Sequence, residues 1–354
     1  MIFRLACFVS CHGYGHAMRA IAVLEALHQR CPEVVADIFT AVPEAIFAQS
    51  LKNYRYHFLR ADVGLVQKDA FTVDLPATLT QLDQFLNFDP ALVADLARQV
   101  EGCEAVLADI SPLGIAVAKK AKIHSVLVEN FTWDWLYGHY LAEYPQFSRY
   151  IDQLAELYSS VTWHIQAEPI CRKGQAAVHC APIARRLRGG AEAWRGQLLG
   201  DGQKLVVVSL PDWDAESAPW LAMATEPTEI HCHFVIAGQK ETKKIASNIT
   251  LLGRDIYHPD IIAAADAVLC KPGASTIAEC AQSGCRVLLV KTASPEEAVL
   301  AEYVRQHLVG DECSLDDTRT GAWLAALPAL LAQPRPKPAA ADGGQAVASF
   351  LAGL

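Results

Sequence analysis

The segment Cys-Lys-Pro-Gly-Ala-Ser-Thr-Ile-Ala-Glu at positions 270–279 carries residue types suited to holding a phosphorylated ligand. It follows an apolar run and precedes a helical pattern, which predicts a corner between a strand and a helix. Gly273 lets the backbone approach a ligand, while Ser275 and Thr276 expose amide protons where a helix dipole favours a diphosphate. Glu279, one turn later, can accept hydrogen bonds from ribose hydroxyls. The alternative is a capping box, in which Thr276 and Glu279 only satisfy helix-start amides.

A second loop, Ser10–Arg19, places two histidines beside two glycines. Its Gly-x-Gly lacks the third glycine of a dinucleotide fingerprint, so the histidines carry the argument. A helix N-terminus disfavours the charged form of a histidine, which leaves His16 neutral and able to act as a base. Alternatively, His16 caps or packs the loop. For His12, which lies earlier in the turn, a structural role is the preferred interpretation.

A base needs a carboxylate to orient it, and Asp109 directly follows the apolar run 105–108. The carboxyl ends of parallel strands meet at one edge of a sheet, so Asp109 can reach the imidazole of His16 and stabilise its protonated form. The alternative is that Asp109 serves as a helix N-cap ahead of Ser111 and Pro112.

The stretch Asn-Phe-Thr-Trp-Asp-Trp at 130–135 follows the next strand at the same edge. Aromatic rings beside polar side chains suit the apolar face and the hydroxyls of a sugar. The alternative is that these aromatic side chains belong to the core.

Strands and helices alternate in both halves of the chain. In the first half, apolar patterns predict strands at 3–9, 34–40, 54–59, 105–108, 125–128 and 161–167, and helices at 16–30 and from 76 to about 100. In the second half, strands are predicted at 205–210, 233–237, 268–270 and 287–290. Strands separated by helices imply parallel order, so we expect an α/β protein with two doubly wound, Rossmann-like domains.

Glycines interrupt this pattern between Ala184 and Asp201, which predicts a linker over 184–201. The expected domains are therefore 1–183 and 202–333, and a proline-rich connector leads to a C-terminal helix within 342–354 that can pack back on the first domain. In open α/β sheets, ligands bind at the carboxyl ends of the strands. We expect the two sheets to face each other and to place both glycine loops at one cleft.

Composition narrows the class of protein. The 354 residues suit two domains of about 150 residues each. Hydrophobic residues make up 52% and charged residues 19%, which indicates a well-packed globular protein. The net charge is 30 − 39 = −9 and no basic stripe appears, which argues against nucleic acid as a partner.

Location and metal content follow from similar observations. The eleven cysteines lack paired spacings, which indicates buried thiols in a reducing compartment. The His-Cys-His at 231–233 has no second pair of ligands nearby, so no metal site is predicted. The N-terminal residues lack the features of a signal peptide, and no apolar run approaches the roughly 20 residues that span a bilayer. The sequence therefore predicts a cytoplasmic protein without a transmembrane segment.

Three segments together resemble the glycosyltransferase-like N-terminal part of plant L-arabinokinases: 12–19, 62–70 and 130–135. The C-terminal half, with Ala265–Asp266 and Lys271–Glu279, is similar to GT-B glycosyltransferases, and most of all to the N-acetylglucosaminyltransferase that completes the peptidoglycan lipid precursor. The Pro-x-x-x-Gly-Leu-x-Ser-Ser-Ala run of the arabinokinase kinase module is absent from the sequence.

The resemblance implies a GT-B fold, with the donor nucleotide sugar in the C-terminal domain and the acceptor mostly in the N-terminal one. It also implies a metal-independent and usually inverting transfer. By resemblance, His16 falls where these enzymes place a loop histidine near the reacting sugar, Asp109 falls near the acid of a His–Asp dyad, and Glu279 matches the ribose-binding glutamate. Where the family often has a Gln or Asp-Gln pair for the donor sugar, this chain has Glu296 and Glu297, which leaves the sugar preference open.

The candidate site residues form four groups. The catalytic pair is His16 and Asp109. Residues expected to bind the donor nucleotide and diphosphate are Gly253, Arg254, Ile256, Gly273, Ala274, Ser275, Thr276, Glu279 and Ser209. Residues expected near the donor sugar are Glu296 and Glu297, and those of the acceptor loops are His12, Gly13, Gly15, Arg19, Trp133 and Asp134. Arg254 has the alternative of a surface ion pair with Asp255 or Asp260, and Ser209 belongs to a strand-end loop, Ser209–Asp212, whose hydroxyl can face a phosphate.

The sequence therefore predicts a glycosyltransferase of hexosyl or N-acetylhexosaminyl type. Its donor is expected to be a nucleoside-diphosphate sugar, most of all a UDP-sugar, its acceptor is an unknown hydroxyl compound, and it needs no cofactor. Two alternatives stay open. One is a nucleotide-sugar epimerase, for which Glu296, Glu297 and His258 supply acids and a histidine, and the other is a non-catalytic regulatory protein that binds a sugar or nucleotide.

Overall fold

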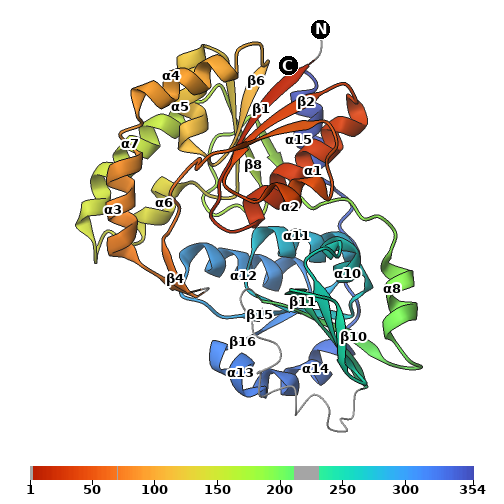
Figure 1. Cartoon of the computed structure of the whole chain (residues 1–354). Coiled ribbons are helices and arrows are strands. Elements are labelled where there is room, and N and C mark those ends of the chain that lie inside the picture. Colours follow the sequence, from red (N-terminus) through yellow and green to blue (C-terminus); the bar gives the residue numbers. More distant parts are fainter. Residues whose placement is uncertain (1–2, 70, 211–230) are drawn as a thin grey trace. The chain divides into compact units, whose positions relative to one another are not determined.

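The computed structural model describes residues 3–69, 71–210 and 231–354. The chain divides into two compact units (Figure 1). Unit 1 comprises Met1–Arg185 and Ala341–Leu354, and unit 2 comprises Arg186–Ala340. Each unit contains its own seven-stranded sheet, so each has a core of its own.

The sheet of unit 1 has the order β3-β2-β1-β6-β7-β8-β9, and all its neighbouring strands run parallel. Its strands are β1 (Arg4–Val9), β2 (Val35–Thr40), β3 (Tyr54–Phe58), β6 (Ala105–Asp109), β7 (His124–Glu129), β8 (Trp163–Ala167) and β9 (Val178–Cys180). A separate antiparallel pair consists of β4 (Gln67–Asp69) and β5 (Thr72–Val73). The strand order reverses between β1 and β6, and such a switch point is where open α/β sheets bind ligands.

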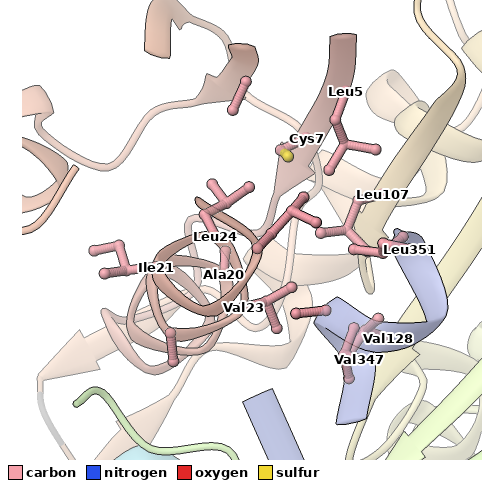
Figure 2. Packing of buried hydrophobic residues seen from close by; sticks show 14 of the residues in the cluster. Leu5, Cys7, Ala20, Ile21, Val23, Leu24, Leu107, Val128, Val347 and Leu351 are labelled. Atoms are coloured by element: carbon pink, nitrogen blue, oxygen red, sulfur yellow. The ribbon is translucent and has the colours of Figure 1, made fainter. Parts of the chain in front are cut away.

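Helices cover both faces of this sheet. They are α1 (Gly15–Arg30), α2 (Glu44–Ala48), α3 (Leu75–Phe85), α4 (Pro90–Gln99), α5 (Pro112–Ala121), α6 (Trp133–Gly138), α7 (Ser148–Ser159) and α15 (Gly343–Leu351), with a 3₁₀ turn at Pro145–Phe147. Because side chains alternate along a strand, Leu5 and Cys7 of β1 face α1 and α15 while Ala6 and Phe8 face the other layer. Figure 2 shows the first of these cores, in which Leu24 of α1 and Leu351 of α15 lie among the strand side chains.

Unit 2 repeats the plan. Its sheet has the order β12-β13-β11-β10-β14-β15-β16, with only β12 antiparallel to its neighbour. The strands are β10 (Lys204–Ser209), β11 (Cys232–Gln239), β12 (Lys243–Ala246), β13 (Ile249–Gly253), β14 (Ala267–Cys270), β15 (Arg286–Val290) and β16 (Gly310–Cys313). The described helices are α8 (Ala191–Leu198), α10 (His258–Ala264), α11 (Ala274–Ser283), α12 (Pro295–His307), α13 (Leu315–Thr320) and α14 (Leu327–Ala332), with a 3₁₀ turn at Ala322–Ala326. Here the switch point lies between β10 and β14.

The alternating α/β plan agrees with the sequence prediction, although strands β9, β12, β13 and β16 were not predicted and two further details differ. The helix expected from 76 to about 100 is two helices, because Asp89 caps α4 ahead of Pro90 and Phe88 has a left-handed φ of 40°. The linker expected over 184–201 belongs to unit 2 from Arg186 onward and contains α8, since Trp194 and Leu198 pack on the core of that unit. Among the helices of the described residues, none is long and apolar enough to cross a membrane.

Candidate functional site

His16 and Asp109 meet at the switch point of unit 1. β1 and β6 are neighbours, with Val9 paired to Asp109, and α1 begins at Gly15, within the predicted loop Ser10–Arg19. The Nδ1 atom of His16 lies 2.8 Å from Oδ1 of Asp109, and both side chains are buried. No side chain caps α1, so the capping half of the alternative for His16 is wrong, whereas the packing half agrees with its buried ring, which lies beside Phe131 and Trp133.

Arg19 completes this cluster. It lies one turn after His16 on the same face of α1, and its guanidinium forms a fork on Asp109, with Nε 2.8 Å from Oδ2 and Nη2 2.5 Å from Oδ1. Its Nη1 donates to the side-chain oxygen of Asn130. Burial alone would raise the pKa of Asp109, but the charge of Arg19 and the hydrogen bonds from His16 and Arg19 outweigh burial and lower it. Arg19, expected in an acceptor loop, is thus buried and bound to Asp109.

The hydrogen-bond pattern assigns the proton on His16. A carboxylate with a lowered pKa only accepts, so Nδ1 of His16 must donate to Asp109. Nη2 of Arg19 lies 3.0 Å from the same Nδ1, a contact whose donor depends on the tautomer of His16, and the shorter contact with the ionised Asp109 favours the hydrogen on Nδ1. In the neutral ring the lone pair is then on Nε2. This is the arrangement of a general base oriented by a carboxylate.

The backbone after Asp109 is strained. Ile110 has φ 44°, a left-handed conformation that is unfavourable for a β-branched residue. Its side chain is fully buried, and its carbonyl accepts a hydrogen bond of 2.8 Å from the hydroxyl of Tyr158. Ser111, whose Oγ accepts from the amide of Gly114, is the N-cap of α5, so the capping alternative for Asp109 is wrong.

Trp133, which is buried, and His12, which is half-buried, pack beside this pair. The indole of Trp133 is 1% exposed, and its Nε1 donates to Oδ2 of Asp62 at 3.0 Å. The ring of His12 contacts Trp133 edge-on at 5.3 Å, and its Nδ1 accepts from the amide of Leu65 at 3.4 Å. Gly64 has φ +66°, and a Cβ there would come within 2.7 Å of the His12 side chain, so the close packing requires glycine. Neither ring is thus an open stacking platform.

Asp62 gives this cluster a second carboxyl group. It is fully buried, and burial raises its pKa although Ser10, His16 and Trp133 partly oppose that effect. The pKa of Asp62 is therefore raised while the pKa of Asp109 is lowered. Opposite pKa shifts of two neighbouring carboxyl groups are common where one acts as an acid and the other as a base.

The remaining acceptor-loop candidates differ in exposure. Gly13 and Gly15 are exposed, and Tyr14 between them is 52% exposed. Asp134 is buried, and its Oδ2 forms an ion pair of 2.6 Å with Arg172. Its Oδ1 is buried without a hydrogen-bond partner. The exposed residues Gly13–Gly15, the tip of the Ser10–Arg19 segment, are thus the part that a ligand can reach directly.

In unit 2, the segment predicted to bind a diphosphate follows β14. Gly273 is the N-cap of α11, no side chain caps the helix, and Ala274, Ser275 and Thr276 form its half-buried first turn. Amide protons at such an open helix start attract an anion. Thr276 lies inside the helix, so the capping box proposed as an alternative for Thr276 and Glu279 is wrong.

Glu279 is 2% exposed and bound within unit 2. Its Oε2 lies 2.8 Å from Nδ1 of His258, the first residue of α10. The Nε2 of the same imidazole lies 3.0 Å from Oγ of Ser209, the last residue of β10. The structure thus brings Ser209 and Glu279 together through a histidine. Pro211 and Asp212, the rest of the loop proposed to follow Ser209, lie outside the described residues.

The next candidates lie at the end of β13 in the same unit: Gly253 is its last residue, and Arg254 and Ile256 follow it. The amide of Gly253 donates to Oγ1 of Thr242 at 3.0 Å, and a Cβ on Gly253 would come within 2.4 Å of Oδ1 of Asp255. Arg254 is exposed, and its Nε donates to the carbonyl of Gly238 at 3.1 Å. Ile256 is half-buried against the core.

The two glutamates expected near the donor sugar occupy the first turn of α12. Glu297 is buried, pairs with Lys271 at 2.7 Å and accepts from the hydroxyl of Thr292. Glu296 is half-buried. Within the described parts of the chain, no group of three or more His, Cys, Asp or Glu side chains is arranged to hold a metal ion.

Three residues of these clusters were not among the candidate site residues of the glycosyltransferase prediction, and His258 was considered only for the alternative epimerase. Asn130 opens the predicted aromatic loop, Asp62 is a lone acid in a loop after β3, and His258 precedes a proline at a helix start. Asp62 and Asn130 each lie in a segment that carries the family resemblance, but no local pattern gave either side chain a role. Their contacts depend on elements far apart in the sequence.

The chain is similar to a plant protein and to several solved structures. It is 29% identical over 330 residues to L-arabinokinase from Arabidopsis thaliana. The matched region covers 90% of this chain and 31% of that protein. The chain thus spans about a third of the length of this curated relative. No protein-family description matches the chain.

The structural comparisons define the class of fold. The glycotransferase of kitacinnamycin superimposes with a TM-score of 0.65 and 16% identity, covering 99% of this chain and 93% of that one. LpCGTa in complex with UDP gives a TM-score of 0.60 and 15% identity, with coverage of 99% and 94%. These matches and the paired seven-stranded sheets show that the chain has the GT-B fold, as the sequence predicted. The particular likeness to the peptidoglycan N-acetylglucosaminyltransferase stays a prediction.

Proposed function

We propose that this chain is a glycosyltransferase that moves a sugar from a nucleoside-diphosphate sugar, with UDP as the expected nucleotide, to an acceptor hydroxyl. The transfer is proposed to invert the anomeric centre and to need no metal. The observation that carries the proposal is the buried His16–Asp109 pair at the switch point of a GT-B unit. The His16 tautomer leaves Nε2 ready to accept a proton.

In the proposed reaction, Nε2 of His16 takes the proton of the acceptor hydroxyl while its oxygen attacks the anomeric carbon. The bond from that carbon to the diphosphate breaks, and its electron pair leaves with the nucleoside diphosphate. Asp109 stabilises the imidazolium through the bond at Nδ1. The amides at the start of α11 stabilise the charge of the leaving diphosphate. The reaction requires the sites of both units to serve one donor and one acceptor.

The remaining candidates take supporting roles in this proposal. Gly253 and Ile256 are assigned to binding of the nucleobase of the donor, and Arg254 to binding of its diphosphate. Glu279 is assigned to the ribose, and Glu296 and Glu297 to the donor sugar. The acceptor is proposed to meet the exposed residues Gly13–Gly15, which the buried side chains of Trp133, Arg19 and Asp109 hold in place.

A thermal-shift screen tests the donor half of the proposal. Uridine, thymidine, guanosine and adenosine diphosphate sugars are added at increasing concentration, and a bound donor raises the melting temperature by mass action. The donor that binds is then incubated with a panel of hydroxyl compounds, and glycosylated product is detected by mass spectrometry. Tight binding with no transfer would favour a sensor, and a changed sugar without an acceptor product would favour an epimerase.

A further inference from the structure

Glu279, the residue assigned to the donor ribose, is connected through the imidazole of His258 to the hydroxyl of Ser209 at the end of β10. Nδ1 of His258 lies 2.8 Å from Oε2 of Glu279, and its Nε2 lies 3.0 Å from Oγ of Ser209. The three residues come from α11, α10 and β10, so the contact exists only in the folded unit. Ser209 is paired with Cys270, three residues before Gly273, which places its hydroxyl at the same sheet edge as the start of α11.

The proton positions in this chain of groups follow from what each group can donate. An ionised Glu279 only accepts, so Nδ1 of His258 carries a hydrogen and donates it. A neutral imidazole then has its lone pair on Nε2, which must accept the hydroxyl hydrogen of Ser209. Ser209 Oγ is left with only lone pairs to offer a ligand.

A diphosphate bridge carries negative charge and only accepts hydrogen bonds, so it is repelled by a hydroxyl oxygen in that state. One proton added to His258 lets the Ser209 hydroxyl donate to the diphosphate. If Nε2 of His258 is protonated, it donates to Ser209 Oγ, and the hydroxyl hydrogen of Ser209 is free for a phosphate oxygen. The carboxylate of Glu279, 2.8 Å from the ring, stabilises the imidazolium.

We propose that binding of the donor diphosphate is coupled to uptake of one proton by His258, which acts on the ligand through Ser209. His258 is then a positioning residue. The inference rests on the proposed function, because it requires a diphosphate at the start of α11. It adds a second source of positive charge to the helix dipole at the leaving group.

Among the residues that the structure describes, Glu279 is the charged side chain that contacts the imidazole of His258. The neighbouring charged side chains are engaged as follows: Arg254 with the Gly238 carbonyl, Asp260 with the amides of Arg188 and Gly190, Lys271 with Glu297, Arg195 with Asp266, and Arg188 over the ring of Tyr257. The ionisation that responds to the ligand is therefore expected at the imidazole.

Calorimetric titration measures the coupling. UDP-, TDP-, GDP- and ADP-glucose are titrated into the full chain at pH 8, where an ordinary histidine is neutral, in buffers of different ionisation enthalpy. The slope of observed enthalpy against buffer enthalpy counts protons, and the diphosphate of a nucleotide sugar does not itself titrate near this pH. We expect uptake approaching one proton for the sugar nucleotide that binds, and none for the matching nucleoside without phosphates.

Matched variants separate the two bonds of His258. In H258N the amide can still donate to Glu279, but no second nitrogen titrates, so uptake should fall to zero and affinity by about tenfold, as for one charge-assisted bond. S209A should also remove the uptake, and it serves if H258N does not fold. The control is H307N, the same change at an exposed histidine of the same unit, which should keep the wild-type slope.

The outcomes distinguish the inference from the proposed function. A wild-type protein that binds a nucleotide sugar without proton uptake overturns the inference alone, and so does H258N or S209A with undiminished uptake. If none of the four nucleotide sugars binds to the wild-type protein, both the proposed function and the inference fail.

Discussion

His16 owes its proposed role to one hydrogen bond, from its Nδ1 to Asp109, which leaves Nε2 as the only atom of the ring that can take a proton. Replacing His16 by alanine should therefore lower the rate of sugar transfer by about 10²-fold or more. Binding of the donor should not change, because the donor is assigned to unit 2. The transfer rate and the donor dissociation constant, measured separately, check this expectation.

His124 supplies a matched control. It begins β7, at the opposite end of the strands from the His16 loop, and its side chain is exposed. H124A should transfer sugar at the wild-type rate. Full activity in H16A, or an equal loss in both variants, would remove His16 from the mechanism.

Asp109 links the chemistry to stability. Its folded-state pKa is lowered, so the folded protein gains stability from the ionised carboxylate above the pKa of the unfolded chain. That gain is lost as pH falls through the folded-state pKa. D109N leaves Arg19 buried without its charge partner, and loss of a buried pair costs about 3–5 kcal/mol at neutral pH.

Denaturant unfolding of the wild type and D109N at several pH values tests this assignment. The difference in unfolding free energy should be largest near pH 7 and should shrink on acidification, because the wild-type carboxylate then becomes protonated. A difference that stays constant with pH would show that the Asp109 charge does not stabilise the fold.

At the scale of elements, the sequence predicted the strands well and the polar contacts poorly. Apolar runs such as the one that forms β6 are visible because a parallel strand buried on both faces needs continuous hydrophobic residues. The pairing of His16 with Asp109 was also predictable, since both follow strands at the switch point. Short edge strands such as β9 and β16 carry polar or mixed residues and gave no such signal.

The partner of an individual polar side chain depends on spatial neighbours that local patterns do not encode. Arg19 sits on an amphipathic helix, where an arginine is ordinarily a solvated residue, and only the folded unit brings it against Asp109 and Asn130. Glu279 matched a capping pattern in its own segment, but its carboxylate is bonded to His258 on another helix. Both differences arise because burial of a charge demands a nearby partner.

The C-terminal helix α15 is an element of unit 1 although it follows unit 2 in sequence. Leu351 is fully buried in the core shared with α1, as Figure 2 shows. L351A should destabilise unit 1 by about 2–5 kcal/mol through loss of burial and the cavity left behind. Urea unfolding measures this, and S349A, an exposed position of the same helix, should be close to wild type. An unaffected L351A would show that α15 is dispensable for the unit.

At the scale of the whole molecule, the same plan occurs twice with different chemistry. In each unit, the strand order reverses beside the first strand, and polar residues gather where the two central strands end. Unit 1 places a histidine, an arginine and two carboxyl groups there, whereas unit 2 places an open helix start and a Ser–His–Glu chain. The first set suits proton transfer and the second suits anion binding, in line with the proposed division of acceptor activation and donor binding between the units.

This division can be tested by hydrogen–deuterium exchange with and without a nucleotide sugar. A donor at the start of α11 should slow exchange of amides in 273–279 and in 253–258, because ligand contacts and a stabilised unit both reduce opening. The loop 10–19 should respond less to donor alone, since its proposed ligand is the acceptor. Protection confined to 10–19, with 273–279 unchanged, would place the nucleotide in the wrong unit and would contradict the division of roles on which the proposed transfer depends.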